Sequence, residues 1–140
     1  MDQEDTIPSL YHWDDRKGPQ PIDPDLDALV RDIIGTVADK WTMLILEALE
    51  DHGTLRFTEV GNKVGGISQK MLTKTLRKME QDGLVARTVH PVIPPHVDYR
   101  LTELGAGLGT ALCGVWEWAA ENREKIEAAR EAFAARDSAR

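Results

Sequence analysis

The stretch that decides the fold is Gly66–Val85, which reads G-I-S-Q-K-M-L-T-K-T-L-R-K-M-E-Q-D-G-L-V. Ser68 is a good helix N-cap, because its hydroxyl can accept a hydrogen bond from a backbone N–H of the first turn. Gly83 lies where helices commonly end in a left-handed residue. Three apolar residues between these caps recur at helical spacing and predict an amphipathic helix: Leu72, Leu76 and Met79.

The outward side of this helix is polar and cationic and has no carboxylate. Its members are Gln69, Lys70, Thr73, Lys74 and Arg77. Such a face suits the DNA major groove, where amides and guanidiniums read base edges and lysines meet phosphates. The alternative is a solvated amphipathic helix, since charged helix faces are common.

The residues around this helix predict a winged helix-turn-helix. A short helix is expected at 58–63, and Gly65-Gly66 supplies the tight turn that leads into the next helix. Residues 84–89 and 97–101 alternate as strands do, and the prolines between them favour a stiff connecting loop. Residues 54–56 are expected to form a short extended segment. We therefore predict a mainly α (α+β) fold with a two-stranded wing.

The remaining residues divide the chain into an arm, a DNA-binding domain and a C-terminal part. Residues 1–24 are polar and proline-rich and are expected to be irregular. Asp23-Pro24 starts a helix that reaches about Val37, and Asp39 can cap a second one. Residues 25–101 form the predicted winged helix-turn-helix domain. In residues 102–140, Thr102 caps one long helix that extends toward Phe133. Because this helix is too long for a small domain to cover, we expect it to form a dimer interface.

The distribution of charge along the chain favours binding to nucleic acid more than the net charge of the whole chain does. The net charge is −7, but residues 54–101 hold 8 Lys/Arg against 4 Asp/Glu, while residues 1–53 hold 4 against 13. The basic charge therefore lies in the segment that contains the cationic helix.

Several other classes of protein are disfavoured. The single Cys113 excludes an intrachain disulfide, and no apolar stretch is long enough to cross a bilayer, so a cytoplasmic protein without a membrane partner is expected. No nucleophile, P-loop, Rossmann or zinc-protease motif is present, so we expect no enzyme and no cofactor. His12, Asp14 and Asp15 lack a spaced partner set, and no metal site is predicted from them.

Four segments carry a resemblance to a known family. They are I-G-T-V-A-D-K-W-T-M-L-I-L (34–46), L-R-F-T-E-V (55–60), G-I-S-Q-K-M-L-T-K-T-L-R-K-M-E-Q-D-G-L-V (66–85) and P-P-H-V-D-Y-R-L-T (94–102). In this order they resemble the HxlR-type winged-helix regulators, whose architecture is related to that of the MarR regulators. The resemblance covers about residues 25–120 and implies a bacterial, dimeric, DNA-binding transcriptional regulator associated with the nucleoid.

The helix-turn-helix interpretation gives each candidate DNA-binding residue a position. Ser68, Gln69 and Lys70 begin the recognition helix, where contact with base edges is deepest. Arg56 precedes the helix-turn-helix, and Lys40 begins the second helix, where backbone N–H groups also favour phosphate. The remaining candidates line the groove or flank the wing loop: Thr73, Lys74, Arg77, His90 and His96. For each histidine the alternative is an exposed loop residue.

Two further sites are predicted from apolar residues. Trp41, Trp116 and Trp118 are candidates for a pocket that takes a flat aromatic effector, and the alternative is core or interface. The candidate dimer residues lie on the long C-terminal helix: Leu104, Leu108, Leu112, Val115 and Trp116.

Thiol sensing does not carry over from the family. The resemblance implies that redox-sensing members have a cysteine shortly before the K-W-T segment, where this chain has Leu26, Asp27 and Ala28. Cys113 lies instead on the C-terminal helix, and we expect it to be mostly buried and slow to react.

Two functions remain open. One is a sequence-specific repressor or activator that acts as a homodimer on a pseudo-palindromic operator, either with or without regulation by an effector. The other is a winged helix that serves as a protein interaction module, because fold does not determine function.

Overall fold

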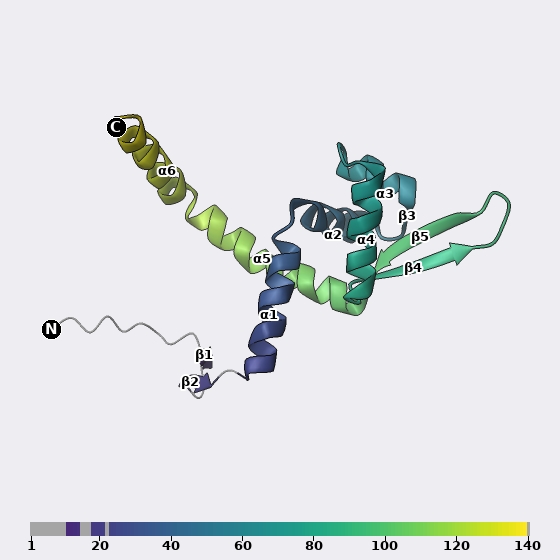
Figure 1. The fold of residues 1–140 in the computed structure, drawn as a ribbon, viewed down its shortest axis with the longest axis horizontal. Helices are drawn as coiled ribbons and strands as arrows, with labels where there is room; N and C mark the ends of the chain where they lie inside the picture. Colours follow the sequence, from purple (N-terminus) through teal and green to yellow (C-terminus); the bar gives the residue numbers. More distant parts are fainter. Residues whose placement is uncertain (1–10, 15–17, 22, 140) are drawn as a thin grey trace. The chain divides into compact units, whose positions relative to one another are not determined.

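A computed structural model describes residues 11–14, 18–21 and 23–139, with side chains from residue 23 onward. Asp15 lies outside the described residues, as do the side chains of His12 and Asp14. The chain divides into two compact units, residues 1–43 and 44–140, and each is described by itself (Figure 1).

The first unit begins with a β-hairpin. Strands β1 (Tyr11–Asp14) and β2 (Gly18–Pro21) pair antiparallel, with Tyr11 opposite Pro21 and Trp13 opposite Pro19. The expectation of a wholly irregular arm was therefore wrong for these residues. In a ribbon of two strands both strands are edges, and an edge can accommodate proline where its missing N–H would face outward.

Helix α1 (Pro24–Val37) starts as its sequence predicts. The Asp23 side chain accepts a hydrogen bond from the Asp25 backbone N–H at 3.0 Å, and Pro24 occupies the first helical position. Four apolar side chains of α1 are exposed within this single chain: Leu26, Leu29, Val30 and Ile34.

The helix-turn-helix follows α2 (Lys40–His52), which the Asp39 side chain caps through the Trp41 N–H at 3.2 Å. It consists of α3 (Phe57–Val64) and α4 (Gln69–Gln81). Gly65 and Gly66 make the turn with φ of +70° and +69°, a conformation that side chains with a Cβ rarely adopt. The predicted glycine turn and both predicted helices are therefore confirmed.

The wing belongs to a three-stranded antiparallel sheet with the order β3-β5-β4. Strands β4 (Val85–His90) and β5 (His96–Leu101) form the predicted two-stranded wing, whose tip projects away from α3 and α4 (Figure 1). The short extended segment becomes β3 (Leu55–Arg56), which pairs with Tyr99 and Asp98 on the free edge of β5.

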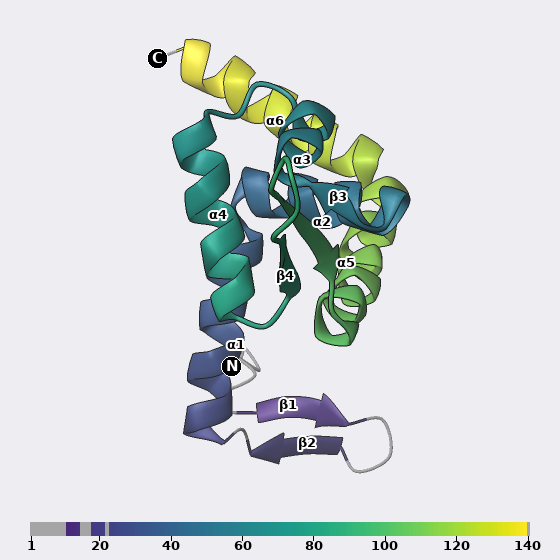
Figure 2. The ribbon, with the colours of Figure 1, turned by 90° about the vertical axis from the view of Figure 1, so that its right-hand side faces the viewer.

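One apolar core joins the helix-turn-helix to this sheet. Figure 2 shows α4 along one side of the unit, with β4 near its C-terminal end. Leu72, Leu76 and Met79 are buried on the inward side of α4, as their spacing predicts. The core cluster comprises Ile45, Leu46, Ala48, Leu49, Leu55, Val60, Leu72, Leu76, Met79, Leu84, Val85 and Tyr99.

The C-terminal end of α4 closes with a Schellman motif. The Leu84 N–H donates to the Met79 carbonyl at 2.9 Å, the Gly83 N–H donates to the Glu80 carbonyl at 3.0 Å, and Gly83 has a φ of +75°. Met79 and Leu84 are both buried, so the apolar contact typical of this motif can form.

Helix α5 (Glu103–Glu121) begins directly against this motif. The Thr102 hydroxyl donates to the Gly83 carbonyl and accepts from the Gly105 N–H at 3.1 Å. A Cβ on Gly105 would lie 2.1 Å from the Leu84 carbonyl oxygen, so the close approach requires glycine.

The C-terminal helix is broken, which corrects the prediction of one long helix. Helix α5 ends at Glu121, and α6 runs from Arg123 to Ser138. Between them Asn122 donates its side-chain amide to the Trp118 carbonyl at 2.9 Å. Asparagine competes for backbone partners in this way and therefore favours helix ends. None of the helices in the described part of the chain is long and apolar enough to span a membrane.

Candidate nucleic-acid interface

The exposed side of α4 carries the polar set that the sequence predicts. The helix begins with the Ser68 hydroxyl accepting from the Met71 N–H at 3.1 Å. Because the apolar residues turn into the core, five predicted DNA-binding residues of α4 are all exposed: Gln69, Lys70, Thr73, Lys74 and Arg77.

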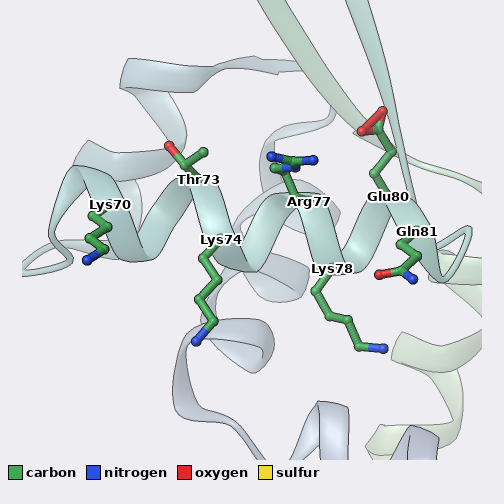
Figure 3. A pocket seen from close by; sticks show the side chains of 7 residues that line it. All are labelled: Lys70, Thr73, Lys74, Arg77, Lys78, Glu80 and Gln81. Atoms are coloured by element: carbon green, nitrogen blue, oxygen red, sulfur yellow. The ribbon is translucent and has the colours of Figure 1, made fainter.

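These side chains form two rows along a shallow groove (Figure 3). Lys70, Lys74 and Lys78 point to one side of the helix, four residues apart in each step. Thr73 and Arg77 point to the other side, where Glu80 follows them. The face that was predicted to lack carboxylates therefore has one at its C-terminal end.

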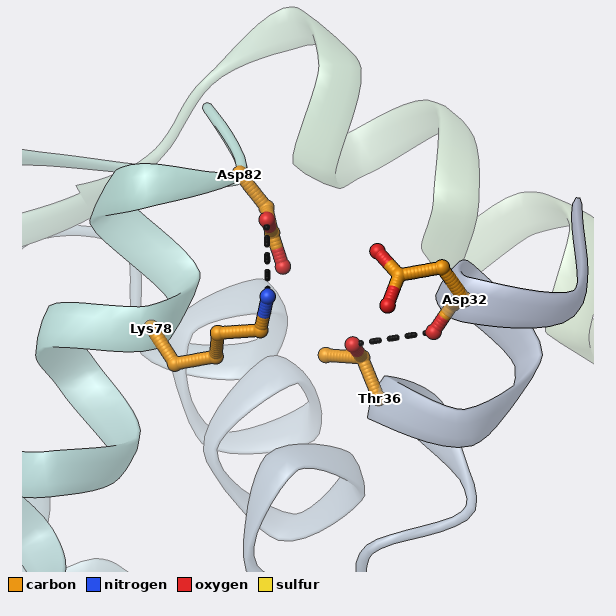
Figure 4. Close-up of polar contacts among 4 residues, drawn as sticks. All are labelled: Asp32, Thr36, Lys78 and Asp82. Atoms are coloured by element: carbon orange, nitrogen blue, oxygen red, sulfur yellow. Dashed lines mark hydrogen bonds and ion pairs between the residues drawn. The ribbon is translucent and has the colours of Figure 1, made fainter. Parts of the chain in front are cut away.

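The cations of α4 differ in whether they are already paired. Lys78 Nζ lies 3.3 Å from Asp82 Oδ1, and the Asp82 side chain is only 13% exposed (Figure 4). Within residues 23–139, Lys70, Lys74 and Arg77 form no ion pair. These three are therefore the α4 cations available to an external anion. Figure 4 also shows the Thr36 hydroxyl donating to the Asp32 carbonyl inside α1, at 3.1 Å.

Thr73 has a restricted role, because its hydroxyl donates to the Gln69 carbonyl at 2.9 Å. Phosphate oxygens only accept hydrogen bonds. Thr73 therefore reaches a phosphate only by giving up this bond, and it more readily offers its methyl group or accepts from a base amine.

A second groove lies between α4 and the sheet. It is lined by Phe57, Thr73, Arg77, Glu80, Arg87 and Tyr99. Arg87, on β4, is not among the DNA-binding residues predicted from sequence. Arg87 is opposite Tyr99 on β5, so its side chain lies on the same side of the sheet as the Tyr99 ring. The alternation of side chains along β4 is the sequence signal that could have placed Arg87 there.

The two cations predicted outside α4 are also exposed. Arg56 lies on β3, and its backbone N–H donates to Glu59 Oε1 at 3.0 Å at the start of α3. Lys40, in the first unit, begins α2, and its Nζ lies 4.8 Å from the Trp41 ring centroid. Their contact with phosphate stays a prediction.

The two wing histidines do not lie separately in an exposed loop. His90 is directly opposite His96 in the β4–β5 ladder, and their rings stack with centroids 4.5 Å apart. Both face Asp98, with Nε2 of His90 at 2.7 Å from Oδ2 and Nε2 of His96 at 3.9 Å from Oδ1. A carboxylate beside both rings makes this part of the wing less favourable for phosphate than sequence alone suggested.

The predicted tryptophan pocket is not supported for Trp116 and Trp118 together. Both lie on α5, two residues apart, and successive residues of a helix turn by about 100°, so these two point about 160° apart. They are 73% and 58% exposed. These two rings therefore face different sides of α5, and their part in an effector pocket stays a prediction. Trp41, in the first unit, is partly buried.

Four of the five predicted dimer residues of α5 separate into two groups, and the fifth, Trp116, is exposed on another side of the helix. Leu108 and Leu112 pack against the core of their own chain. Leu104 and Val115 are exposed, and with Trp118 they fall within about 60° of one another on the helix, at 62%, 60% and 58% exposure. These three residues, here called the α5 stripe, form an apolar face without a partner within residues 23–139.

The expectation that Cys113 is buried was wrong for this chain, because the residue is exposed. Its thiol contacts the Gly109 carbonyl of the same helix at 3.4 Å. By helical spacing Cys113 lies about 160–180° from Val115 and Leu104, on the other side of α5 from the α5 stripe.

Comparisons with known proteins agree with this architecture. A model of the HxlR-like helix-turn-helix family matches residues 36–127. The HTH-type transcriptional regulator YtfH of Escherichia coli is 40% identical over 105 residues, which cover 75% of this chain and 82% of that protein.

Two solved structures are similar in both fold and sequence. The transcriptional regulator ytfH from Salmonella typhimurium has a TM-score of 0.62 at 41% identity, over 73% of this chain and 90% of that one. The reduced form of the transcriptional regulator YodB from Bacillus subtilis has a TM-score of 0.60 at 34% identity, over 70% and 91%.

Proposed function

The chain belongs to the HxlR-like helix-turn-helix family of DNA-binding transcriptional regulators, and we propose that α4 is its recognition helix and reads the major groove of an operator. The observation that supports this most is the exposure of Lys70, Lys74 and Arg77 in the two rows on the outward side of α4, without ion pairs among residues 23–139. Cations that are not neutralised within the protein are those that can replace the counterions of DNA phosphates.

The position of each residue on α4 would determine whether it contacts base edges or phosphates. Gln69 and Lys70 lie in the first turn, which enters the groove most deeply in helix-turn-helix proteins. The Gln69 amide can both donate to and accept from adenine, so it is the candidate for base preference. Lys74 and Arg77, one and two turns further, would meet phosphates or base edges along the groove.

Phosphate contacts would extend beyond α4. The Ser68 hydroxyl accepts from the Met71 N–H and keeps its own proton for a phosphate oxygen. Arg56 on β3 and Lys40 at the start of α2 present exposed charges beside helix N-termini, where backbone dipoles also favour anions.

We propose further that the protein acts as a homodimer through the α5 stripe, with the exposed apolar residues of α1 contributing. Apolar side chains such as Leu104, Val115 and Trp118 gain free energy when a partner removes them from water. Two-fold symmetry then implies a pseudo-palindromic operator whose half-sites lie about 34–36 Å apart, or a multiple of that. Trp41, which is partly buried, stays a candidate contact for a flat aromatic effector.

The test begins with selection of binding sites from random DNA by the purified protein, followed by affinity measurements at several salt concentrations. The triple variant Lys70→Ala/Lys74→Ala/Arg77→Ala should lower the salt slope by up to about three units. The matched control, Lys125→Ala/Arg130→Ala/Arg136→Ala, removes the same charge from exposed positions of α6 and should keep nearly the wild-type slope.

The same measurement separates DNA reading from a protein interaction module. If no sequence is enriched, or if both triple variants bind the selected DNA as wild type does, α4 is not the reader. The winged helix would then serve as an interaction module.

A further inference from the structure

Three side chains with metal-binding atoms converge on the wing, from positions that are not adjacent in sequence. His96 and Asp98 are two residues apart on β5, so they share one side of the strand. His90 is the cross-strand partner of His96 and therefore projects to the same side. The hairpin register thus assembles two imidazoles and one carboxylate on one face of the sheet.

The distances between these groups fit a shared ion. One ligand atom from each residue can be chosen so that all three lie within 4.8 Å of one another. Tetrahedral ligands at the Zn–N and Zn–O distance of about 2.0–2.1 Å are separated by about 3.3 Å. The widest pair therefore has to close by about 1.5 Å, which rotation of partly exposed side chains can supply.

We propose that the wing binds a divalent transition-metal ion of the Zn²⁺ class through His90, His96 and Asp98. This inference concerns the free protein and does not depend on the proposed operator binding. Both imidazoles direct Nε2 toward the carboxylate, and imidazole nitrogen suits Zn²⁺ and its neighbours, whereas Mg²⁺ and Ca²⁺ prefer all-oxygen sites.

The ion would replace the 2.7 Å contact between His90 Nε2 and Asp98 Oδ2 as the link across the wing. Three protein ligands leave at least one coordination position for water, as in open zinc sites. The bound charge would also reverse the sign of a wing face whose carboxylate now disfavours phosphate.

The alternative is that these side chains only stiffen the hairpin through a hydrogen bond between strands. That hydrogen bond needs one proton between His90 Nε2 and Asp98 Oδ2 and no metal ion. The two possibilities differ in a direct way, since only a metal site binds Zn²⁺ with one ion per chain and only a metal site gives a visible spectrum with Co²⁺.

The experiment uses the full chain freed of metal with a chelator and titrated with Zn²⁺ against a chromophoric competitor, without DNA. The control variant is His12→Ala/His52→Ala, which removes the two other histidines of the sequence and keeps the proposed ligands. The test variants are His90→Gln, His96→Gln and Asp98→Asn. Glutamine and asparagine keep hydrogen-bonding ability at similar size, and circular dichroism checks their fold.

The control variant should bind one Zn²⁺ per chain and show the Co²⁺ spectrum. Each test variant should bind at least about tenfold more weakly, because loss of an outer partner of a metal ligand already costs about 10–100-fold. Zn²⁺ should also raise the melting temperature of the control but not of a test variant that stays folded. The proposal is overturned if the control binds no stoichiometric Zn²⁺, or if His90→Gln and His96→Gln bind as tightly as the control.

Discussion

Single side chains on α4 differ in what they can offer to DNA although they look equivalent in sequence. Lys74 and Lys78 are one turn apart in the same row, but Lys78 is already paired with Asp82. We predict that Lys74→Ala lowers the salt slope of DNA binding by about one unit. Lys78→Ala should lower it by less, because that charge is partly neutralised. Equal slopes for the two variants in matched buffers would contradict this ordering.

Gln69 is predicted to carry base preference rather than general affinity. Gln69→Ala should weaken binding to the selected operator by about 1–3 kcal/mol and relax the preference at one base position. Gln81→Ala is the matched control, since the same side chain is removed from the opposite end of α4. Competition binding with operators substituted at each position measures both effects. A uniform loss across all sequences would make Gln69 a phosphate contact instead.

Cys113 is exposed, but its position argues against control of DNA binding by its oxidation. The chain has one cysteine, so no intrachain disulfide can form, and the thiol donates a hydrogen bond to the Gly109 carbonyl of its own helix. We predict that mild peroxide leaves operator affinity unchanged in wild type and in Cys113→Ser. Loss of binding in wild type alone, measured under identical oxidation, would identify the thiol as a sensor.

At the scale of elements, the junction between α4 and α5 is predicted to tolerate little change. Gly105→Ala would place a Cβ against the Leu84 carbonyl oxygen, and such overpacking typically costs about 1–3 kcal/mol. Gly107→Ala and Gly114→Ala are matched controls on the same helix, where a Cβ meets nothing within 4 Å. They should stabilise by up to about 1 kcal/mol. Thermal and urea unfolding of the three variants tests this, and similar effects at all three positions would exclude the clash.

The elements also show which features can be predicted from sequence. The caps at Ser68 and Gly83 and the glycine turn were predictable, because each depends on neighbouring residues alone. The break at Asn122 was missed because apolar spacing continues on both sides of it. The cluster of His90, His96 and Asp98 was missed because it depends on strand register, which a proline-containing loop does not determine in an obvious way.

Burial was the property that single-sequence reasoning predicted least well. Leu108 and Leu112 were assigned to a dimer interface but pack on their own core, while Cys113 was assigned to the interior but is exposed. An amphipathic pattern shows that a helix has an apolar side, but it does not tell whether that side meets its own chain or another one.

At the scale of the whole molecule, the α5 stripe leads to a prediction about assembly. Val115→Glu places a charge at the centre of the proposed interface and should shift the protein from dimer to monomer at micromolar concentration. Operator affinity should fall with it, because two half-sites would then be bound independently. Thr110→Glu adds the same charge on another side of α5 and should remain dimeric. Light scattering that shows a monomeric wild type, with and without DNA, would contradict the proposed dimer.

The bond between the Thr102 hydroxyl and the Gly83 carbonyl has a mechanical consequence. It links the Schellman motif that ends α4, the proposed recognition helix, to the N-cap of α5, the helix proposed to hold two copies together. The chain also approaches closely at Gly105, where a Cβ would meet the Leu84 carbonyl oxygen. Any rotation of one α5 against the α5 of the second copy would therefore move the attached helix-turn-helix with it. A small rotation at the proposed dimer interface would then become a larger displacement at the DNA, where it changes the distance between the two α4 helices.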